Sequence, residues 1–591
     1  MTSTTEKTLR AEQLEFSELP FTRLFRDYLA GTDAITEFYG HPHTYSALKK
    51  AVCSFEPHSD RREKSRIIAE FNEPFLQGQT VDQLAGILAH ENTVTITTGQ
   101  QLSIFGGPLY TVFKTVSAIH LARSLTRDTG KRVVPVFWLA DEDHDFEEIS
   151  VVNMPEPDGI RQIALPCDNC ARHAAGSIRV DQAFEQFRSE IYESLKPTDF
   201  REQLVVMLDE AYAPGRSYRE AFALLLSKLF SHHGLIFAGS NSPMVKKHVS
   251  ECIRIAIDRV DEIRDTLAKQ SERLGRHYHQ QVQVTDSLLF WHDEEQGRVR
   301  LQHGDGHWKT DSGLSFSTGE LLEKLDETPE RFSPNVFLRP LIQDAILPNA
   351  AYIGGPAEIA YYGQMKPVYE LFDRDMPFVA ARFSATLVEP PVGRFLEELP
   401  FDFSDYIKRF EDLEQHYLRK FGNPELDNHF DSWKRQVDEL TNQMIVLTGM
   451  EEPGLQKHAR SLSREYTKSL DKLRKKMVNT IRQKEEVQVN RIHKVKHAFF
   501  PNNRLQEREI AHIYFMNKFG MDIWDRILNK LEELERNYDQ DQDHDHDYDR
   551  DQGQNKNRDH DHDYDHDRDQ GQNKNRDHDH GLFNRHFLIH L

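Results

Sequence analysis

Five consecutive ionisable or acidic side chains, Asp141-Glu142-Asp143-His144-Asp145, directly follow the apolar segment Val133–Leu139. Carboxylates this close repel one another, which raises their pKa values unless a cation, a donor or a substrate amine lies nearby. We expect His144 to act as a general base that frees an amine nucleophile, with Asp143 or Asp145 orienting it. A divalent metal site at Asp143, His144 and Asp145, and a solvated acidic loop, are the alternatives.

Two glycine-containing turns are the second set of candidates. The first contains Thr98-Gly99-Gln100-Gln101 and then Gly106-Gly107-Pro108, with Lys114 in the helix behind it. The second, Gly354-Gly355-Pro356, also follows an apolar segment and opens a helix. Glycine allows close backbone approach, and free amides at a helix start favour anionic groups. Two such turns predict two halves of one cleft, although a purely structural strand–helix turn also explains each of them.

Further polar side chains follow the second turn and the last apolar segment. We expect Lys114 and Arg382 to hold anionic groups in the cleft. Tyr361 and Tyr362 fit equally well as core residues that expose one polar tip. The candidate substrate- or nucleotide-binding residues are Thr98, Gly99, Gln100, Gln101, Gly106, Gly107, Pro108, Lys114, Glu142, Gly354, Gly355, Glu358, Tyr361, Gln364, Lys366, Arg382 and Ser384.

The chain has four cysteines, which are too few for a disulfide framework and suit a reducing cytosol. Cys167 and Cys170 form a CxxC pair, with His173 three residues further on. Such a pair is half of a zinc site or a redox pair, but the sequence has no second CxxC. We therefore interpret it as a surface loop with incidental thiols and expect no firm metal requirement.

Alternating strands and helices must position these residues. Short apolar runs, separated by helical segments, occur at Thr93–Thr97, Val133–Leu139, Leu235–Ala238, Ala350–Ile353 and Phe378–Ala381. This alternation predicts an α/β fold with an open, mostly parallel sheet. Ligands of such sheets bind at the carboxyl ends of the strands, where both glycine turns lie.

The composition divides the chain into four parts. Residues 1–395 form the predicted core, in which residues 1–92 are helical and about 281–316 form a small antiparallel insertion. In residues 400–499, apolar side chains recur at three- and four-residue steps from Leu462 to Ile481, after a partner helix at Trp433–Thr448. This pattern predicts an antiparallel coiled-coil arm, with a flat helical bundle as the alternative. Residues 500–536 are predicted to return to the core as a helix.

Residues 537–591 are a low-complexity tail in which a His/Asp-rich repeat occurs twice, at 543–558 and 559–576. So few apolar residues cannot offset the entropy lost on ordering, so we predict disorder. The tail contributes to a net charge of −22 over 591 residues. No basic face for nucleic acid, no apolar run long enough to span a membrane and no signal pattern is evident, which favours a cytoplasmic protein.

Several long segments resemble one known family. They are TTGQQLSIFGGPLYTVFKTVSAIHLA from Thr97, PVFWLADEDHDFEEI from Pro135, LRPLIQDAILPNAAYIGGPAEIAYYGQMKPVYE from Leu338 and RFSATLVE from Arg382. In content and order these segments closely resemble the bacillithiol biosynthesis cysteine-adding enzymes, over about residues 20 to 535.

This resemblance implies a ligase that joins the carboxyl group of L-cysteine to the amine of glucosaminyl-malate, with a Rossmann-like core and a coiled coil that supports homodimers. Amide formation from a free carboxylate is uphill in water, so we expect ATP as an activating cosubstrate, although HIGH- and KMSKS-type signatures are absent from the sequence. Two other classes remain open. One is a metal-dependent amidohydrolase that uses Asp141–Asp145, and the other is a non-enzymatic coiled-coil scaffold.

Overall fold

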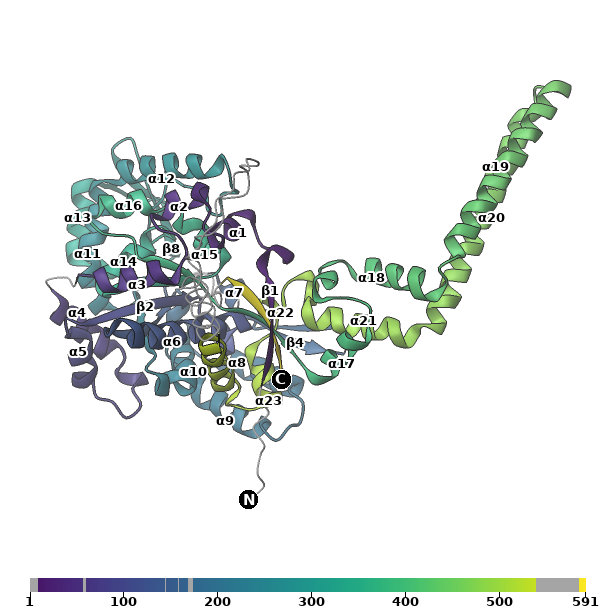
Figure 1. The fold of residues 1–591 in the computed structure, drawn as a ribbon. Coiled ribbons are helices and arrows are strands. Elements are labelled where there is room, and N and C mark those ends of the chain that lie inside the picture. The colour runs from purple at the N-terminus through teal and green to yellow at the C-terminus, as the bar shows by residue number, and fades with distance from the viewer. Residues whose placement is uncertain (1–8, 57–59, 144, 158, 168–173, 538–583) are drawn as a thin grey trace, which may run out of the picture. The chain divides into compact units, whose positions relative to one another are not determined.

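The computed structural model describes residues 9–56, 60–143, 145–157, 159–167, 174–537 and 584–591 (Figure 1). These residues divide into two units. The core unit comprises Met1–Pro155, Ile160–Thr386 and Glu507–Ile589, and the coiled-coil unit comprises Glu156–Gly159, Leu387–Gln506 and His590–Leu591. The predicted boundaries near residues 395 and 500 compare with 386 and 506 in this division.

A five-stranded parallel sheet forms the centre of the core unit, and it confirms the predicted α/β class. Its strands are β2 (Thr93–Gln100), β3 (Arg132–Leu139), β6 (Ile236–Gly239), β12 (Asn349–Gly354) and β13 (Phe378–Ala381). The spatial order is β13-β12-β2-β3-β6. The chain therefore builds outward from β2 in one direction and then from β12 in the other, so the strand order reverses between these two neighbours.

Helices bury the sheet, as a parallel sheet requires. On one face, Val94 and Ile96 of β2 pack in one cluster with Leu48 of α3 (Tyr45–Ser54) and with Leu121 and Leu125 of α6 (Leu109–Thr129). The first helices of the core unit are α1 (Arg23–Leu29), α2 (Asp33–Tyr39), α3 (Tyr45–Ser54), α4 (Arg61–Phe71), α5 (Val81–Ala89), α6 (Leu109–Thr129), α7 (Phe146–Ile149), α8 (Gln182–Ser194), α9 (Arg201–Ala211) and α10 (Tyr218–Phe230). They are followed by α11 (Pro243–Asp258), α12 (Val260–Gly275), α13 (Thr318–Glu327), α14 (Leu338–Ile346), α15 (Pro356–Tyr362), α16 (Lys366–Leu371), α22 (Gln506–Glu509), α23 (His512–Phe519) and a helix over residues 523–537.

The predicted antiparallel insertion is confirmed as a five-stranded sheet of order β10-β9-β8-β7-β11. Its strands are β7 (Leu289–Asp293), β8 (Gly297–Gly304), β9 (His307–Thr310), β10 (Ser315–Ser317) and β11 (Phe332–Pro334). Residues 281–284, expected to be its first strand, are not in a strand. The sequence also did not predict the pair β4 (Val151–Glu156) and β5 (Gly159–Ala164).

The C-terminus corrects the prediction of a disordered tail for its last residues. Strand β15 (Arg585–His590) lies between β1 (Arg10–Glu15) and β14 (Ser384–Val388) in a three-stranded sheet. Phe587, Leu588 and Ile589 are at most 2% exposed. The charged repeats dominate the average composition of residues 537–591, so composition alone does not predict the short apolar strand that follows them. The repeats themselves, within residues 538–583, lie outside the described residues.

The coiled-coil unit contains the predicted helical hairpin. Helices α19 (Leu426–Glu451) and α20 (Leu455–Lys484) are antiparallel and joined by a short turn, and the ion pair Lys434–Asp471 (2.7 Å) links them. The other helices are α17 (Pro390–Glu398), α18 (Phe410–Tyr417) and α21 (Glu486–Phe499). In the part of the chain that the structure describes, none of the helices combines the length and the apolar character needed to cross a bilayer.

Candidate active site

The two predicted glycine turns lie next to each other in the core unit. Strands β2 and β12 pair in register, with Thr98 opposite Ile353, so their carboxyl ends meet at one edge of the sheet. Because the strand order reverses between these strands, this edge, called the crevice below, is the position at which doubly wound sheets bind their ligands. A Cβ atom on Gly99 would lie 2.8 Å from the carbonyl oxygen of Trp138, so glycine is needed for β2 to end against β3.

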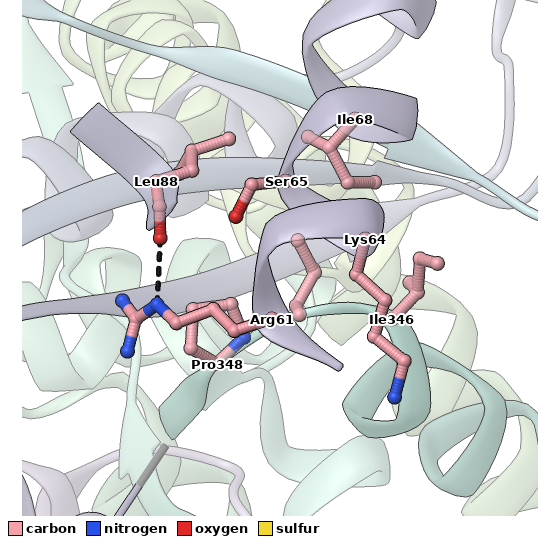
Figure 2. Close-up of a pocket in the computed structure, with 8 residues that line it drawn as sticks. Arg61, Lys64, Ser65, Ile68, Leu88, Ile346 and Pro348 are labelled. Atoms are coloured by element: carbon pink, nitrogen blue, oxygen red, sulfur yellow. Dashed lines mark hydrogen bonds between the residues drawn. The ribbon is translucent and has the colours of Figure 1, made fainter. Parts of the chain in front are cut away.

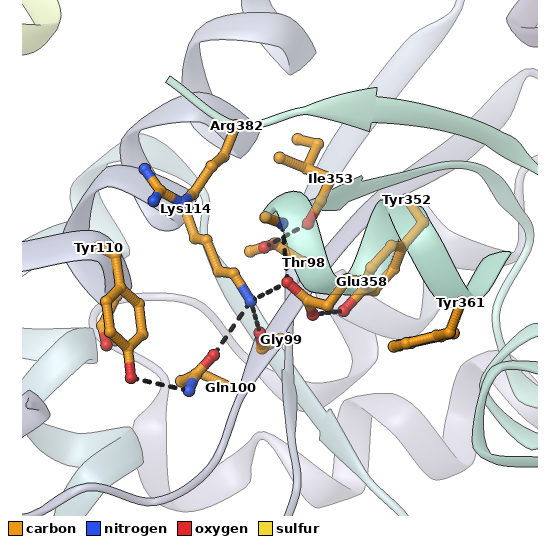
Figure 3. Close-up of polar contacts among 12 residues, drawn as sticks. Thr98, Gly99, Gln100, Tyr110, Lys114, Tyr352, Ile353, Glu358, Tyr361 and Arg382 are labelled. Carbon is orange, nitrogen blue, oxygen red and sulfur yellow. Dashed lines mark hydrogen bonds and ion pairs between the residues drawn. The ribbon is translucent and has the colours of Figure 1, made fainter. Parts of the chain in front are cut away.

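A buried ion pair joins the two turns. Lys114, in the second turn of α6, places its Nζ 2.5 Å from Oε2 of Glu358 in α15 (Figure 3). The same ammonium donates to the carbonyl oxygen of Gly99 at 2.7 Å and to Oε1 of Gln100 at 3.0 Å. An ammonium has three N–H groups, and these three contacts use all of them. Lys114, which is 3% exposed, therefore holds the end of β2 against the helix that follows β12.

Glu358 is the acceptor at the centre of this arrangement. Burial alone would raise the pKa of its carboxyl, but the Lys114 ammonium, the Gly355 N–H (2.8 Å) and the Tyr352 hydroxyl together hold that pKa below its usual value. Burial lowers the pKa of Lys114, and Glu358 opposes that shift. The Glu358 side chain remains 20% exposed, so an ionised carboxylate faces the crevice.

Arg339 is a site residue that the sequence did not single out. Its Nη2 donates to the Tyr361 hydroxyl at 2.6 Å, and its guanidinium lies over the Tyr352 ring at 5.6 Å. The half-buried Arg339 adds a second cation beside Lys114, whereas Glu358 is the carboxylate that they share. Lys114, Glu358 and Arg339 together carry one positive charge, and the carboxylate of Asp143 lies further along the end of β2, beside Gln101. The place of Arg339 at the start of α14, before β12, gave no local signal of this role.

Half-buried polar side chains continue the site along the end of β2. Gln100 donates from Nε2 to the hydroxyl of Tyr110 at 3.1 Å. Gln101 donates from Nε2 to Oδ2 of Asp143 at 2.6 Å. Burial raises the pKa of Tyr110 to about 12, so this phenol is neutral at physiological pH. Asp143 of the acidic run therefore lies beside the first predicted glycine turn.

The other described members of the acidic run have partners elsewhere. Asp141 is fully buried, and burial raises its pKa to about 7 against the opposing charge of Arg219 at 3.8 Å. Glu142 is buried against Lys246 and Ser240. Asp141 and Glu142 therefore have structural roles in the core.

Asp145 accepts the N–H of Glu148 at 3.3 Å and so caps α7. His144, the predicted general base, lies outside the described residues, as do Cys170 and His173 of the CxxC region.

The described carboxylates of this run do not converge on one point. Among the described residues, the group that could hold a metal is instead His232, His233 and Asp525, which lies before β6 and so at the opposite edge of the sheet. Arg123 donates to Nδ1 of His233 at 2.6 Å, which leaves the proton on Nε2 for Asp525 (2.6 Å). In that tautomer the group forms a hydrogen-bonded network in which Nε2 of His233 already donates to Asp525.

Several predicted residues have structural positions. Thr98 donates from Oγ1 to the carbonyl oxygen of Ile353 at 2.9 Å and ties β2 to β12. Gln364 donates to Oγ of Ser271 at 2.7 Å and points away from the crevice, toward α12. Lys366 lies against Gly40. The structure therefore does not bring Gln364 and Lys366 to the other candidates.

The turn Gly106-Gly107-Pro108 is covered by the C-terminal part of the core unit. The N–H of Leu109 donates to the carbonyl oxygen of Ile510 at 3.0 Å, and the N–H of His512 donates to that of Gly107 at 3.2 Å. The expectation that the amides of this turn are free for an anion is wrong at Leu109, because a distant carbonyl satisfies the helix start.

Arg382 also differs from the expectation that it holds an anionic ligand. Its guanidinium donates to both carboxylate oxygens of Glu507, at 2.5 and 3.0 Å, and all three charged or polar groups of this cluster, including Ser384, are buried. The backbone N–H of Arg382 donates to the carbonyl oxygen of Gly354 at 3.0 Å. Arg382 therefore supports the second glycine turn, while its charge is balanced by Glu507.

A separate small pocket lies away from this crevice (Figure 2). Its lining includes Arg61, Ile346 and Pro348, and Arg61 donates to the carbonyl oxygen of Leu88 at 2.8 Å. Ile346 and Pro348 precede β12, so the pocket is at the amino ends of the strands, opposite the edge where doubly wound sheets bind ligands.

Comparisons with known proteins identify both parts of the chain. A sequence model described as "Bacillithiol biosynthesis BshC, N-terminal Rossmann-like domain" matches residues 9–383, and one described as "Bacillithiol biosynthesis BshC, C-terminal coiled-coil domain" matches residues 385–539. A Salinibacter ruber protein named "Putative cysteine ligase BshC" is 30% identical, covering 86% of this chain and 94% of its own. A Bacillus cytotoxicus protein of the same name is 27% identical, covering 87% and 97%.

Among solved structures, a Campylobacter jejuni chain described as a "putative arginyl t-RNA synthetase" is similar with a TM-score of 0.21 and 8% identity, covering 75% of this chain and 96% of its own. This similarity is too low to indicate a shared fold or function.

The substitution Glu358→Gln tests the ion pair that holds the crevice together. It leaves the buried Lys114 ammonium without its carboxylate, so we expect the free energy of unfolding to fall by about 3 kcal/mol in urea titrations. Lys114→Met combined with Glu358→Gln removes both charges and should recover part of this loss. Strictly additive losses in this double-mutant cycle would contradict the pairing.

Proposed function

Because the chain belongs to the bacillithiol biosynthesis BshC family, we propose that it is a cysteine ligase that forms an amide between the carboxyl group of L-cysteine and the amine of glucosaminyl-malate. The name of its relatives supports a ligase and cysteine as a substrate. The assignment of glucosaminyl-malate as the acceptor and of an amide as the new bond is based on the resemblance of the glycine turns and the acidic run to the family.

The observation that carries the proposal is the position of the buried Lys114–Glu358 pair at the reversal point of the sheet. Amide synthesis needs a cation that binds the anionic substrate and a basic group that accepts a proton. Half-exposed groups of both kinds lie around this pair. Arg339 supplies a guanidinium for an anionic substrate, and Asp143 supplies a carboxylate next in sequence to the predicted base His144. The acceptor carries two malate carboxylates, and its amine must lose a proton as it attacks.

We assign each group a place in the reaction. The malate carboxylates bind at Arg339, because the three N–H groups of Lys114 already have protein acceptors, and the sugar amine then points along β2 toward Asp143. The amine attacks the activated carbonyl of cysteine, the new C–N bond forms, and the activating group leaves with the electron pair of its bond. His144, oriented by Asp143 or Asp145, takes the amine proton.

The cysteine carboxylate must be activated, and ATP is the activating cosubstrate that we propose. The amides of Leu109 and Gly355 already have protein acceptors, so the two turns do not present these N–H groups to a phosphate. For that reason no step is assigned to the nucleotide here. The metal-dependent amidohydrolase gains no support from the described carboxylates, since each has its own partner.

We further propose that the enzyme works in the cytoplasm as a homodimer formed through the coiled coil. Trp433, Leu440 and Leu447 follow one another at seven-residue steps on α19 and are 39%, 59% and 63% exposed. A seven-residue apolar repeat is the spacing with which helices pack against a partner helix.

The activity is tested by incubating the purified full chain with cysteine and glucosaminyl-malate, with and without ATP, and detecting bacillithiol by mass spectrometry. We expect product in the presence of ATP and none without it. Replacement of cysteine by serine is the control, because the product would then lack the thiol mass. Absence of product under every nucleotide condition would contradict the ligase assignment.

Arg339→Gln tests the binding of the acceptor. Loss of a charged hydrogen bond of about 1.5–3 kcal/mol should raise the KM for glucosaminyl-malate roughly tenfold to a hundredfold, while the KM for cysteine changes little. Arg254→Gln, which removes a half-buried arginine paired with Asp326, is the matched control and should leave both constants unchanged. If a methyl glucosaminide without malate showed the same rise, Arg339 would not bind the malate carboxylates.

The dimer is tested by analytical ultracentrifugation of the 68.9-kDa chain. We expect the wild type to sediment at twice this mass, and Leu440→Glu/Leu447→Glu to sediment as a monomer, because buried unpaired carboxylates oppose association. Val206→Glu, at an exposed apolar position of α9, should remain dimeric. A monomeric wild type at micromolar concentration would exclude this assembly.

A further inference from the structure

The last strand of the chain makes polar contacts that the proposed reaction does not use. His586 of β15 is completely buried, and both of its ring nitrogens have hydroxyl partners on the neighbouring strand β14. Nδ1 lies 2.8 Å from Oγ of Ser384, and Nε2 lies 3.0 Å from Oγ1 of Thr386. Burial of a histidine with both nitrogens bonded on one strand fixes the orientation of the ring.

The donors in this group can be assigned by following the protons. Ser384 Oγ donates to Oε2 of Glu507 at 2.9 Å, which uses its single proton. The contact with His586 must then have Nδ1–H as the donor and Ser384 as the acceptor. Nε2 is left with its lone pair, which accepts the hydroxyl proton of Thr386. Thr386, His586, Ser384 and Glu507 are thus linked by one directed chain of hydrogen bonds.

This chain ends on Arg382. Glu507 accepts two hydrogen bonds from the Arg382 guanidinium and a third, at 3.2 Å, from the N–H of Ala385. Arg382 in turn bonds through its backbone to Gly354, and a Cβ on Gly355 would lie 3.6 Å from its Nε. The orientation of the Glu507 carboxylate therefore determines where Arg382 stands against the second glycine turn.

We propose that His586 is a positioning residue of the candidate site, which acts through Ser384 and Glu507 to hold Arg382 and the Gly354–Gly355 turn in place. The expected effect on catalysis rests on the proposed ligase function. The coupling of His586 to Glu507 and Arg382 does not depend on it. The last strand of the chain, which follows the His/Asp-rich repeats, is thereby a part of the site's support and not a dispensable extension.

The charge state of His586 agrees with this assignment. Burial lowers the pKa of His586 to about 4, with Arg382 acting in the same direction and Glu507 opposing it. The folded ring is therefore neutral at pH 7, as the directed chain requires. Between pH 6.5 and 4 the unfolded chain binds a proton that the folded ring does not, so the stability contributed by His586 is full above pH 6.5 and is lost as the pH falls toward 4.

The test compares two substitutions on the same strand in the full chain. His586→Phe keeps a buried ring but removes both hydrogen bonds, whereas Phe587→Leu weakens the contact with Phe383 (ring centroids at 5.5 Å) and leaves the directed chain intact. We expect His586→Phe to lower kcat roughly tenfold to a hundredfold with little change in the KM for cysteine, because the turn is misplaced. Phe587→Leu should lower the melting temperature while kcat stays within about twofold. Losses of kcat that follow the melting temperature in both variants would overturn the proposal.

A second measurement does not depend on activity. The urea midpoints of His586→Phe, Glu507→Gln and the double variant form a cycle. We expect the double variant to unfold close to the less stable single variant, because each change breaks the same chain of hydrogen bonds. Midpoint shifts that simply add would overturn the coupling. If the wild type forms no bacillithiol while the cycle is strongly non-additive, the ligase assignment fails and the coupling of His586 to Glu507 stands.

Discussion

Placing an ammonium and a carboxylate together inside a sheet edge is unfavourable unless nearly every hydrogen-bonding position of both is satisfied. Lys114 and Glu358 meet this condition through Gly99, Gln100 and Gly355. The backbone of both turns takes part, because the carbonyl oxygen of Gly99 accepts from Lys114 and the N–H of Gly355 donates to Glu358. The Lys114–Glu358 ion pair therefore holds the ends of β2 and β12 together where the strand order reverses.

The second buried pair extends this arrangement to the end of the chain. Arg382 and Glu507 neutralise each other behind the β12 turn, so this pair adds no net charge to the Lys114, Glu358 and Arg339 group. Residues from three distant parts of the sequence thus determine the electrostatics of one site. This distribution explains why the C-terminal segment belongs to the core unit, although the helical hairpin separates it in sequence from the sheet.

Local patterns in the sequence were sufficient to predict the five core strands, the start of α6 near Pro108 and the helical hairpin. Apolar runs and glycine junctions are local signals, so they survive without knowledge of the packing. The roles of single polar residues are not local. Glu142 in the acidic run is bound by Lys246, which is 104 residues away, and Arg339 reaches the site only through the packing of α14 against α15 residues. Strand β15 was missed because the charged repeats before it dominated the composition.

The central claim is that substrates bind at the carboxyl ends of β2 and β12, around the Lys114–Glu358 pair. Hydrogen–deuterium exchange of the full chain, with and without glucosaminyl-malate and cysteine, tests this most directly. The account predicts slower amide exchange in peptides that cover residues 97–114 and 349–364, with little change in those that cover residues 61–68. Protection confined to the segment 61–68, or to the coiled-coil hairpin, would place binding elsewhere and contradict the account.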